Sequence, residues 1–443
     1  MRNVKEILRH LIELKCVNDP EKNIKPSKEC IDGITSLLEN KGIEYTKLED
    51  DGYYSFIHVH GSGKRVVLLM AHFDVVPPGP SWTRNPFEAI EENGRIYGRG
   101  AVDDLSNVAA MIHIARELDR IVDRLDATIV IAFTGDEETG GAHGASKVRE
   151  FLITKNLFPS YLINGDGGGL VIINRRRTSF RVEISIKANK KRVRGSRFSR
   201  RYDLVSRYRH AAYFQLGVDT HPMIKLAYDL DQEDLYISSL KGSFVKSNVL
   251  PEYVEADLVS RDENSRAEEE IDTALTNLVK LLLPLTHIMI EPDYPSVYGV
   301  TATPNIYRYI NDTHVIEIDV RAPLKKGVDP LKKYVSSIVR EYLPSASFSV
   351  YGGVGYLDTP RNSRIIRKAE KVLESLGIEP RVVEKAGASD SRYFSPLGVE
   401  AIDFGPVGGG AHGPDEYVEI WSLDLLTRFY KKLATELLSP DEE

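Results

Sequence analysis

Two kinds of hydrophobic pattern alternate over the first 178 residues of the chain. Apolar residues recur at helical spacing over residues 3–15, 27–41 and 107–118. Continuous runs rich in valine, isoleucine and leucine fill residues 54–60, 65–74, 127–135 and 160–166. Strands that are apolar on both faces must be covered on both faces, so this alternation predicts an α/β fold in which helices cover a parallel or mixed sheet.

The same pattern returns near the C-terminus, where we expect helices over 363–377 and 422–438 and strands over 379–385 and 400–406. The segment between them shows strands of alternating polarity over 179–188, 314–323 and 346–352, and helices over 267–283 and 330–343. A chain of 443 residues is also too long for one hydrophobic core. We therefore predict a domain made of residues 1–178 and 355–443, interrupted by an α+β domain made of residues 179–354.

Composition describes an ordinary globular protein, with 42% hydrophobic and 28% charged residues. The formal net charge of −7 disfavours nucleic acid or an anionic membrane as the main partner. The N-terminus lacks the continuous apolar core of a signal peptide, and the most apolar later stretch is interrupted by Lys280 and Pro284. Cys16 and Cys30 are too few for a disulfide framework or a thiolate metal cluster, and they fit a reducing compartment. A cytoplasmic protein without a membrane partner is expected.

One stretch departs from this acidic balance, with ten lysine or arginine residues between Lys187 and Arg209. Basic residues with interleaved aromatics can form a nucleic-acid patch. On an acidic protein, a solvated and partly mobile loop is the favoured interpretation. Nucleic acid is therefore not the expected partner.

Imidazole and carboxylate side chains follow predicted strands or glycine-rich turns at five places along the chain. His72 and Asp74 stand two residues apart where a strand ends, so they emerge on the same face. The other places hold Asp103 and Asp104, then Asp136, Glu137 and Glu138, then Asp166, and finally His412. Open α/β sheets carry their chemistry beyond the ends of their strands, so these groups are expected to converge.

So many clustered carboxylates would repel one another strongly without a cation. Imidazole and carboxylate donors without cysteine suit zinc, cobalt or manganese in an open catalytic site. Three ligating carboxylates and one hydroxide would balance the charge of two divalent ions. His58 and His60 share one face of a strand and could form a rival metal site, but this strand ends in the turn GSGK and an exposed hairpin is expected.

The motifs HFDVVP, GRGAVDD, GDEETGG, NGDGGG and GGGAHGPDEYV occur in this order. Together they resemble the dinuclear-zinc metallopeptidase and deacylase family that includes glutamate carboxypeptidase, acetylornithine deacetylase, succinyl-diaminopimelate desuccinylase and aminoacylase. The resemblance implies a zinc-peptidase-like catalytic domain interrupted by a lid or dimerisation domain. It also implies two divalent metal ions, with zinc favoured over cobalt or manganese. The implied reaction is hydrolysis of the amide bond of an N-acyl amino acid by a hydroxide that bridges the metals.

The resemblance assigns metal ligands by position. Asp103 would bridge the two ions, Glu138 and His412 would bind one of them, and His72 and Asp166 would bind the other. Glu137 would be the general base, and Asp74 would orient His72 by accepting its second ring N–H. The family also has a cis peptide after the bridging aspartate, here between Asp103 and Asp104.

The resemblance places further site residues in the inserted domain and near the C-terminus. His210 fits the lid histidine that stabilises the oxyanion, with His221 as a rival. Four substrate-contacting residues are implied, namely Asn305, Arg321, Gly387 and Arg392. A homodimer through the inserted domain is implied too. Where the family has Lys-Gly, this chain has Leu105-Ser106-Asn107, so local substrate contacts are expected to differ.

Two alternatives to an N-acyl-amino-acid deacylase stay open. A dipeptidase or carboxypeptidase of the same family would differ only in the pockets that hold the leaving group and the acyl group. A catalytically silent binding or scaffold protein would instead use the basic stretch. Metal-dependent hydrolysis of a small N-acyl amino acid or short peptide would separate the deacylase and the peptidase from the silent binding protein.

Overall fold

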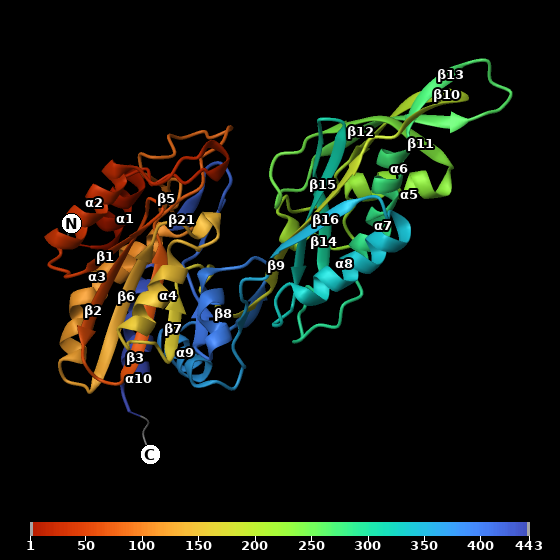
Figure 1. The fold of residues 1–443 in the computed structure, drawn as a ribbon. Helices are drawn as coiled ribbons and strands as arrows, with labels where there is room; N and C mark the ends of the chain where they lie inside the picture. The colour runs from red at the N-terminus through yellow and green to blue at the C-terminus, as the bar shows by residue number, and fades with distance from the viewer. Residues whose placement is uncertain (1–2, 441–443) are drawn as a thin grey trace. The chain divides into compact units, whose positions relative to one another are not determined.

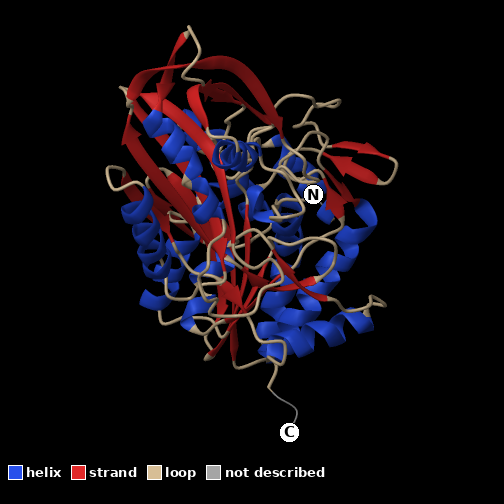
Figure 2. Cartoon of the chain, turned by 90° about the vertical axis from the view of Figure 1, so that its right-hand side faces the viewer, coloured by secondary structure: helices blue, strands red, loops and turns tan. Residues whose placement is uncertain are grey.

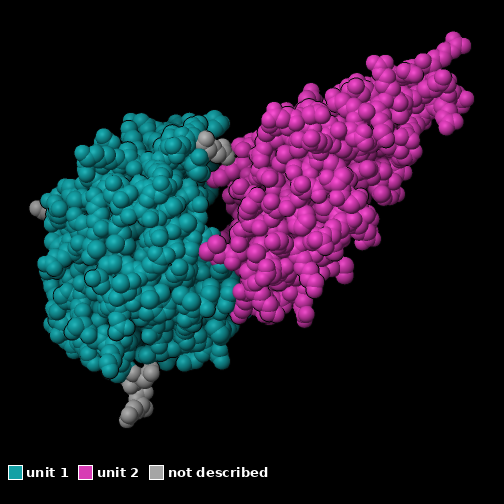
Figure 3. Space-filling model, viewed as in Figure 1, with its two compact units in different colours: residues 1–176, 355–385, 389–443 teal, residues 177–354, 386–388 magenta. Residues whose placement is uncertain are grey.

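The computed structural model describes residues 3–440 (Figures 1 and 2). The chain divides into two compact units (Figure 3). Unit 1 comprises residues 1–176, 355–385 and 389–443, and unit 2 comprises residues 177–354 and 386–388. Unit 1 is therefore discontinuous in sequence, and unit 2 is inserted within it.

A nine-stranded mixed sheet forms the centre of unit 1, with the order β1-β2-β6-β3-β7-β19-β8-β17 and β18 beside β8. Its strands are β1 (Thr46–Asp50), β2 (Tyr53–Gly61), β3 (Arg65–His72), β6 (Ala127–Thr134), β7 (Tyr161–Asn164), β8 (Ile172–Arg176), β17 (Leu357–Asp358), β18 (Val382–Lys385) and β19 (Glu400–Asp403). β3 runs parallel to β6 and β7, and β19 runs parallel to β7. The carboxyl ends of these four strands therefore meet at one edge of the sheet, and the predicted mixed α/β sheet is confirmed.

Helices cover both faces of this sheet (Figure 1). They are α1 (Val4–Glu13), α2 (Lys28–Asn40), α3 (Leu105–Val122), α4 (Ala145–Thr154), α9 (Arg364–Ser375) and α10 (Ile420–Leu438). Val67 and Leu69 of β3 pack in a core with α1, α2, α3, α9 and α10. Leu68 and Met70 pack on the other side, with α4. Alternate side chains of one strand thus enter two cores, which explains why its sequence is apolar throughout.

A second, small sheet of unit 1 brings distant loops together, with the order β20-β21-β5-β4. Its strands are β4 (Ile90–Glu92), β5 (Arg95–Tyr97), β20 (Gly408–Gly409) and β21 (Tyr417–Glu419). β21 pairs antiparallel with β5, so the turn that follows β5 lies next to the loop that precedes β21. The first segment carries Asp103 and the second carries His412.

Unit 2 contains two four-stranded sheets, β14-β15-β9-β16 and β11-β12-β10-β13. Its strands are β9 (Thr178–Lys187), β10 (Lys190–Asp203), β11 (Leu235–Gly242), β12 (Tyr253–Arg261), β13 (Glu268–Asp272), β14 (Thr301–Ile310), β15 (Thr313–Ala322) and β16 (Ser347–Gly352). Its helices are α5 (Pro222–Gln232), α6 (Thr273–Lys280), α7 (Leu282–Thr286) and α8 (Asp329–Tyr342). The 3-10 helices of the two units are η1 (Pro20–Lys22), η2 (Glu137–Thr139), η3 (Ala211–Tyr213), η4 (Asp390–Tyr393) and η5 (Ser395–Leu397).

The helix predicted over residues 267–283 is wrong at its N-terminal end, because residues 268–272 form strand β13. In the β10–β13 pair, Glu268 lies opposite Arg194 and Glu270 lies opposite Arg192. Opposite charges across a strand pair stabilise the pairing, and the single sequence does not reveal that partner. The helix begins only at Thr273, where the Asp272 carboxylate accepts a hydrogen bond from the backbone N–H of Leu275 at 3.0 Å.

The basic stretch is also different from the mobile loop that was expected. Most of it forms strand β10, whose arginines pair with acidic neighbours in unit 2. Arg197 contacts Asp257 at 2.6 Å, and Arg200 contacts Glu233 at 2.9 Å. Because Arg197 and Arg200 already have acidic partners, this part of the stretch is not an unpaired basic surface of the kind that binds nucleic acid.

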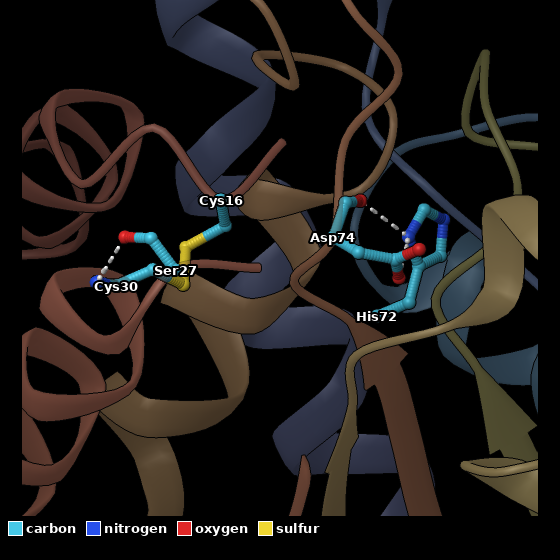
Figure 4. Close-up of a disulfide and its surroundings, with 5 residues drawn as sticks. All are labelled: Cys16, Ser27, Cys30, His72 and Asp74. Carbon is cyan, nitrogen blue, oxygen red and sulfur yellow. Dashed lines mark hydrogen bonds and ion pairs between the residues drawn. A yellow bond between two sulfur atoms is a disulfide. The ribbon is translucent and has the colours of Figure 1, made fainter. Parts of the chain in front are cut away.

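Two other expectations need correction. Cys16 and Cys30 form a disulfide with each other (Figure 4). Because disulfides are rare in reducing compartments, these two cysteines do not support the expectation of one. His58 is buried rather than exposed, and its Nε2 atom lies 2.8 Å from Oδ1 of Asp119. A carboxylate on α3 therefore meets a polar residue of the sheet.

Within residues 3–440, none of the helices is long and apolar enough to cross a membrane.

Candidate metal centre and catalytic site

His72 is the last residue of β3, and its ring is buried between two aspartates. Nε2 lies 3.2 Å from Oδ1 of Asp103. Nδ1 lies 3.0 Å from the carbonyl oxygen of Asp74 and 3.4 Å from Oδ1 of the same residue. One ring nitrogen thus faces Asp103, while the other is held by the residue two positions along the chain.

Asp103 presents its two carboxylate oxygens to two different imidazoles. Oδ1 faces His72, and Oδ2 lies 3.2 Å from Nε2 of His412. The peptide bond between Asp103 and Asp104 is cis, as the resemblance implied. The Asp104 carboxylate accepts a hydrogen bond from the backbone N–H of His72 at 3.0 Å, so the two loops are joined.

Glu137 and Glu138 begin the short helix η2 directly after β6. Their backbone N–H groups donate to the two oxygens of Asp74, at 3.1 Å and 3.2 Å respectively. Oε1 of Glu138 lies 2.9 Å from Nε2 of His412. Asp74 thereby positions both glutamates as well as His72, and Glu138 joins the same cluster as Asp103.

His412 lies in the loop between β20 and β21 and has a backbone φ of +61°. This left-handed conformation is unfavourable for most residues with a side chain, and such conformations gather at functional sites. The loop holds His412 against Asp103 and Glu138, which come from two other segments of unit 1.

The donor set fits a divalent cation. Within residues 3–440, donor atoms of His72, Asp103 and Glu138 all lie within 4.8 Å of one another. His412 adds a second imidazole to this group. Neutral imidazole and carboxylate oxygen are the donors that catalytic zinc sites use. Asp166 follows β7 and instead pairs with Arg176, with 3.0 Å between Oδ1 and Nη2.

The electrostatics of these groups reflect the same crowding. Burial alone would raise the pKa of Asp103, but His412 and His72 hold it well below its usual range. The negative charge of Glu138 raises the pKa of His412 well above its ordinary value. The carboxylates therefore stabilise positive charge at this position, and a metal ion would replace the imidazole protons.

Glu137 and Asp166 have the opposite shift. Burial raises the pKa of Glu137 well above its ordinary value, and the negative charges of Asp390 and Glu138 raise it further, although His72 opposes the change. Burial likewise raises the pKa of Asp166, against the lowering effect of Arg176. A raised pKa is what a general base needs in order to hold the proton that it takes up, and Glu137 has this property.

Of the predicted substrate residues, Arg392 lies in unit 1, where Nη2 donates to the carbonyl oxygen of Gly140 at 2.6 Å. Among the described residues, its buried Nε atom has no hydrogen-bond partner. Burial alone would lower the pKa of its guanidinium, but the negative charges of Asp390 and Glu137 raise it above its ordinary value. Gly387 belongs to the short segment that joins unit 2.

The remaining predicted residues lie in unit 2. Nε2 of His221 lies 3.1 Å from Oδ1 of Asn305, and both side chains are buried. Burial lowers the pKa of His221 to about 4. Arg321 forms a two-pronged pair with Asp319, with both contacts at 2.9 Å. His210 precedes η3, and its Nδ1 atom accepts a hydrogen bond from the backbone N–H of Ala212 at 3.1 Å.

The segment that departs from the family's Lys-Gly faces the interior. Ser106 and Asn107 are fully buried. Asn107 donates to the carbonyl oxygen of Gly165 at 2.6 Å and accepts from the Tyr430 hydroxyl at 2.6 Å. These two side chains therefore support the loops behind the site instead of lining its surface.

Two residues of the site were missed in the sequence. Asn18 donates through Nδ2 to Oδ2 of Asp74 at 2.8 Å, and nothing in its local sequence marks it. Glu416 accepts hydrogen bonds from the backbone N–H groups of Gly100, Val102 and Asp103, at 3.0, 3.0 and 3.1 Å. Glu416 lies within the motif GGGAHGPDEYV, so the motif contained the only available signal.

A discontinuous α/β unit with an imidazole and carboxylate cluster at the strand ends defines a metal-dependent hydrolase. Residues 68–436 match the model of peptidase family M20/M25/M40, and the chain belongs to this family. It is a metal-dependent amide hydrolase.

Comparison with individual proteins agrees with this assignment. The chain is 24% identical over 423 residues to the succinyl-diaminopimelate desuccinylase of Blochmanniella pennsylvanica, covering 92% of this chain and 93% of that protein. The fold is shared with the M20 family metallo-carboxypeptidase Sso-CP2 from Sulfolobus solfataricus, with a TM-score of 0.66, 17% identity, and coverage of 99% and 100%. It is also shared with the aminoacylhistidine dipeptidase from Vibrio alginolyticus, with a TM-score of 0.68, 14% identity, and coverage of 99% and 97%.

Proposed function

We propose that this protein hydrolyses the amide bond of an N-acyl amino acid at a site that holds two divalent metal ions, zinc being favoured. The observation that carries the proposal is the position of Asp103, whose two oxygens each face a different imidazole. A carboxylate in this position is suited to bridging two cations. The name of the curated relative makes N-succinyl amino acids the first substrates to test.

We assign the metal ligands by these contacts. Asp103 would bridge, His412 and Glu138 would hold one ion, and His72 and Asp166 would hold the other. When bound, the ions acidify water and polarise the scissile carbonyl. For Asp166 to act as a ligand, its pairing with Arg176 through Oδ1 must leave one carboxylate oxygen for the ion.

The chain's own residues would then handle the proton and the substrate. We assign Glu137 as the base that takes a proton from the attacking water and returns it to the leaving nitrogen, because its raised pKa suits both steps. Asp74 would orient His72 and both glutamates. We assign Arg392 to the carboxylate of the amino acid, since a guanidinium reads a carboxylate through paired hydrogen bonds.

The lid residues complete the proposal. We assign His210 rather than His221 to the oxyanion, because Nε2 of His221 is already occupied by Asn305 inside unit 2. Asn305 and Arg321 of unit 2, together with Gly387, would support substrate binding. Because Arg321 is already paired with Asp319 through two contacts, we assign it a supporting role and no direct contact with the substrate.

The test is hydrolysis of a panel by purified protein loaded with zinc or cobalt, with an EDTA control for each substrate. The panel contains N-succinyl, N-acetyl and N-formyl amino acids, together with dipeptides. Metal-dependent release of a free amino acid from the N-acyl compounds is expected. Cleavage of the dipeptides alone would replace the deacylase proposal with the peptidase alternative, which the names of the two structural neighbours favour.

A homodimer through unit 2 is a further part of this proposal. In the edge strand β14, Tyr309 and Ile310 are 46% and 52% exposed, which would suit a contact with a second copy. Sedimentation of the intact protein at micromolar concentration tests this assignment. A monomer at all concentrations would remove it without affecting the proposed chemistry.

A further inference from the structure

The chain beyond β3 carries Asp74 and is held by residues 16–18, which lie outside the sheet's strands. The backbone N–H of Val75 donates to the carbonyl oxygen of Cys16 at 3.0 Å. The backbone N–H of Asn18 donates to the carbonyl oxygen of Val75 at 2.9 Å. Val17 and Val75 thus form an isolated parallel bridge, and this segment extends the pairing past His72.

Asn18 is only 1% exposed, and its side chain reaches Asp74 directly. Nδ2 lies 2.8 Å from Oδ2 of Asp74, and Oδ1 accepts a hydrogen bond from the Tyr53 hydroxyl at 3.4 Å. Because an ionised carboxylate can only accept hydrogen bonds, the amide nitrogen must be the atom that faces Asp74. Asn18 therefore adds a side-chain donor to a carboxylate that is itself fully buried.

The disulfide fixes the start of this segment. Cys16 is the first residue of the bridge, and Cys30 lies in the first turn of α2, next to the helix cap formed by Ser27 (Figure 4). Both cysteines are buried, at 1% and 0% exposure, so the bond is an internal tether. The bond joins the start of this segment covalently to α2.

We propose that Asn18 is a positioning residue for the metal ligand His72, acting through Asp74, and that the Cys16–Cys30 disulfide holds Asn18 in place. The backbone joins Cys16 to Asn18 over two residues, Asn18 donates to the Asp74 carboxylate, and Oδ1 of that carboxylate lies 3.4 Å from Nδ1 of His72. Residues that orient a ligating histidine change metal affinity by roughly 10- to 100-fold when they are removed. Asn18 is one step further out, so an effect at the lower end is expected.

This inference rests on the proposed metal site, and the experiment separates the two. Zinc and cobalt affinities of the full chain are measured by competition with a chromophoric chelator, and the visible absorption of the cobalt form reports ligand geometry. Asn18→Ala is expected to weaken metal binding by about tenfold and to change the cobalt spectrum. The matched control is Ser27→Ala, which removes the cap of α2 but keeps both the disulfide and Asn18.

A double-mutant cycle tests the tether. The variant carrying Cys16→Ser and Cys30→Ser is expected to bind metal more weakly than the wild type. Asn18→Ala should lose less affinity in that background than in the wild type, because the tether and the amide act through the same contact. These measurements are made at a temperature where circular dichroism shows every variant folded.

Three outcomes would contradict the inference in different ways. Equal metal affinity and an unchanged cobalt spectrum in Asn18→Ala would remove the positioning role. An equal loss in Ser27→Ala would assign the effect to general destabilisation. A wild-type protein that binds no metal would overturn the proposed function itself, and this inference with it.

Discussion

Oε1 of Glu416 accepts a hydrogen bond from the backbone N–H of Asp103 at 3.1 Å, although 313 residues separate them in the sequence. Glu416 also accepts from Gly100 and Val102 and pairs with the buried Arg99 at 2.5 Å. One carboxylate thus fixes the turn that presents Asp103 and closes the loop that presents His412. This link joins the two segments that present Asp103 and His412.

Replacing Glu416 should therefore damage both stability and metal binding. Glu416→Gln is expected to lower the free energy of unfolding of the metal-free protein by about 3 kcal/mol, because it leaves the buried Arg99 without its counter-charge. Denaturant unfolding measures this change. Glu419→Gln at the end of β21, three residues further along the chain, is the control, since its partner Arg95 is partly exposed and the expected loss is below about 1 kcal/mol. A Glu416 variant as stable as the control would contradict the structural role.

Glu137 should be needed for turnover and not for metal binding. Glu137→Ala is expected to lower kcat by roughly 10²- to 10⁴-fold, the usual contribution of general acid–base catalysis, while the metal content stays at the wild-type level. Steady-state kinetics and elemental analysis of the same preparation check both parts. A variant with near wild-type kcat would remove Glu137 from the reaction.

His412→Ala should show the opposite behaviour, since His412 contacts both Asp103 and Glu138. Metal content should fall, and activity should fall with it. Added zinc should restore part of the activity, because the other ligands remain. His143→Ala is the matched control, as this partly exposed histidine pairs with Asp50 instead of the cluster. Full metal content in His412→Ala would exclude this residue as a ligand.

Removing the metal ion with a chelator should destabilise unit 1, because the proposed ligands lie in that unit. Asp103, Glu138 and His412 lie close together, so removing the ion leaves only protonated imidazole to balance the two carboxylates. A ligand that binds only the folded state stabilises it, by about 4 kcal/mol when its concentration is 1,000 times its Kd. EDTA should therefore lower the thermal unfolding temperature, and zinc should restore it. An unfolding temperature that EDTA leaves unchanged would count against a bound metal.

His221 should make the stability of the protein depend on pH. Burial lowers its pKa from an ordinary 6.5 to about 4, so the unfolded chain takes up a proton before the folded one as the pH falls. Stability should fall between about pH 6.5 and pH 4, by up to about 3 kcal/mol from this group. The free energy of unfolding, measured with denaturant at several pH values, should change less with pH for His221→Asn than for the wild type. The exposed His287→Asn is the control and should retain the wild-type slope.

The parts of the fold that could be predicted follow from short-range pattern. Leu68 and Leu69 lie in a run that is apolar at every position, and such a run indicates a strand with both faces covered. The polar residues at its end, His72 and Asp74, signalled the site for the same local reason. The helix predicted across residues 268–272 failed because the partner strand β10, seventy or more residues away in sequence, decided the conformation.

The sequence by itself determined the chemistry of this protein: which strands are buried, which imidazoles and carboxylates stand at their ends, and the family that those motifs identify. Only the tertiary structure decided which polar groups support one another, such as Glu416 with Asp103 and Asn18 with Asp74. It also paired Cys16 with Cys30 and buried His58 against Asp119. The physical reason is range: hydrophobic periodicity acts between neighbours, whereas a buried hydrogen bond needs a partner that only the folded chain brings near.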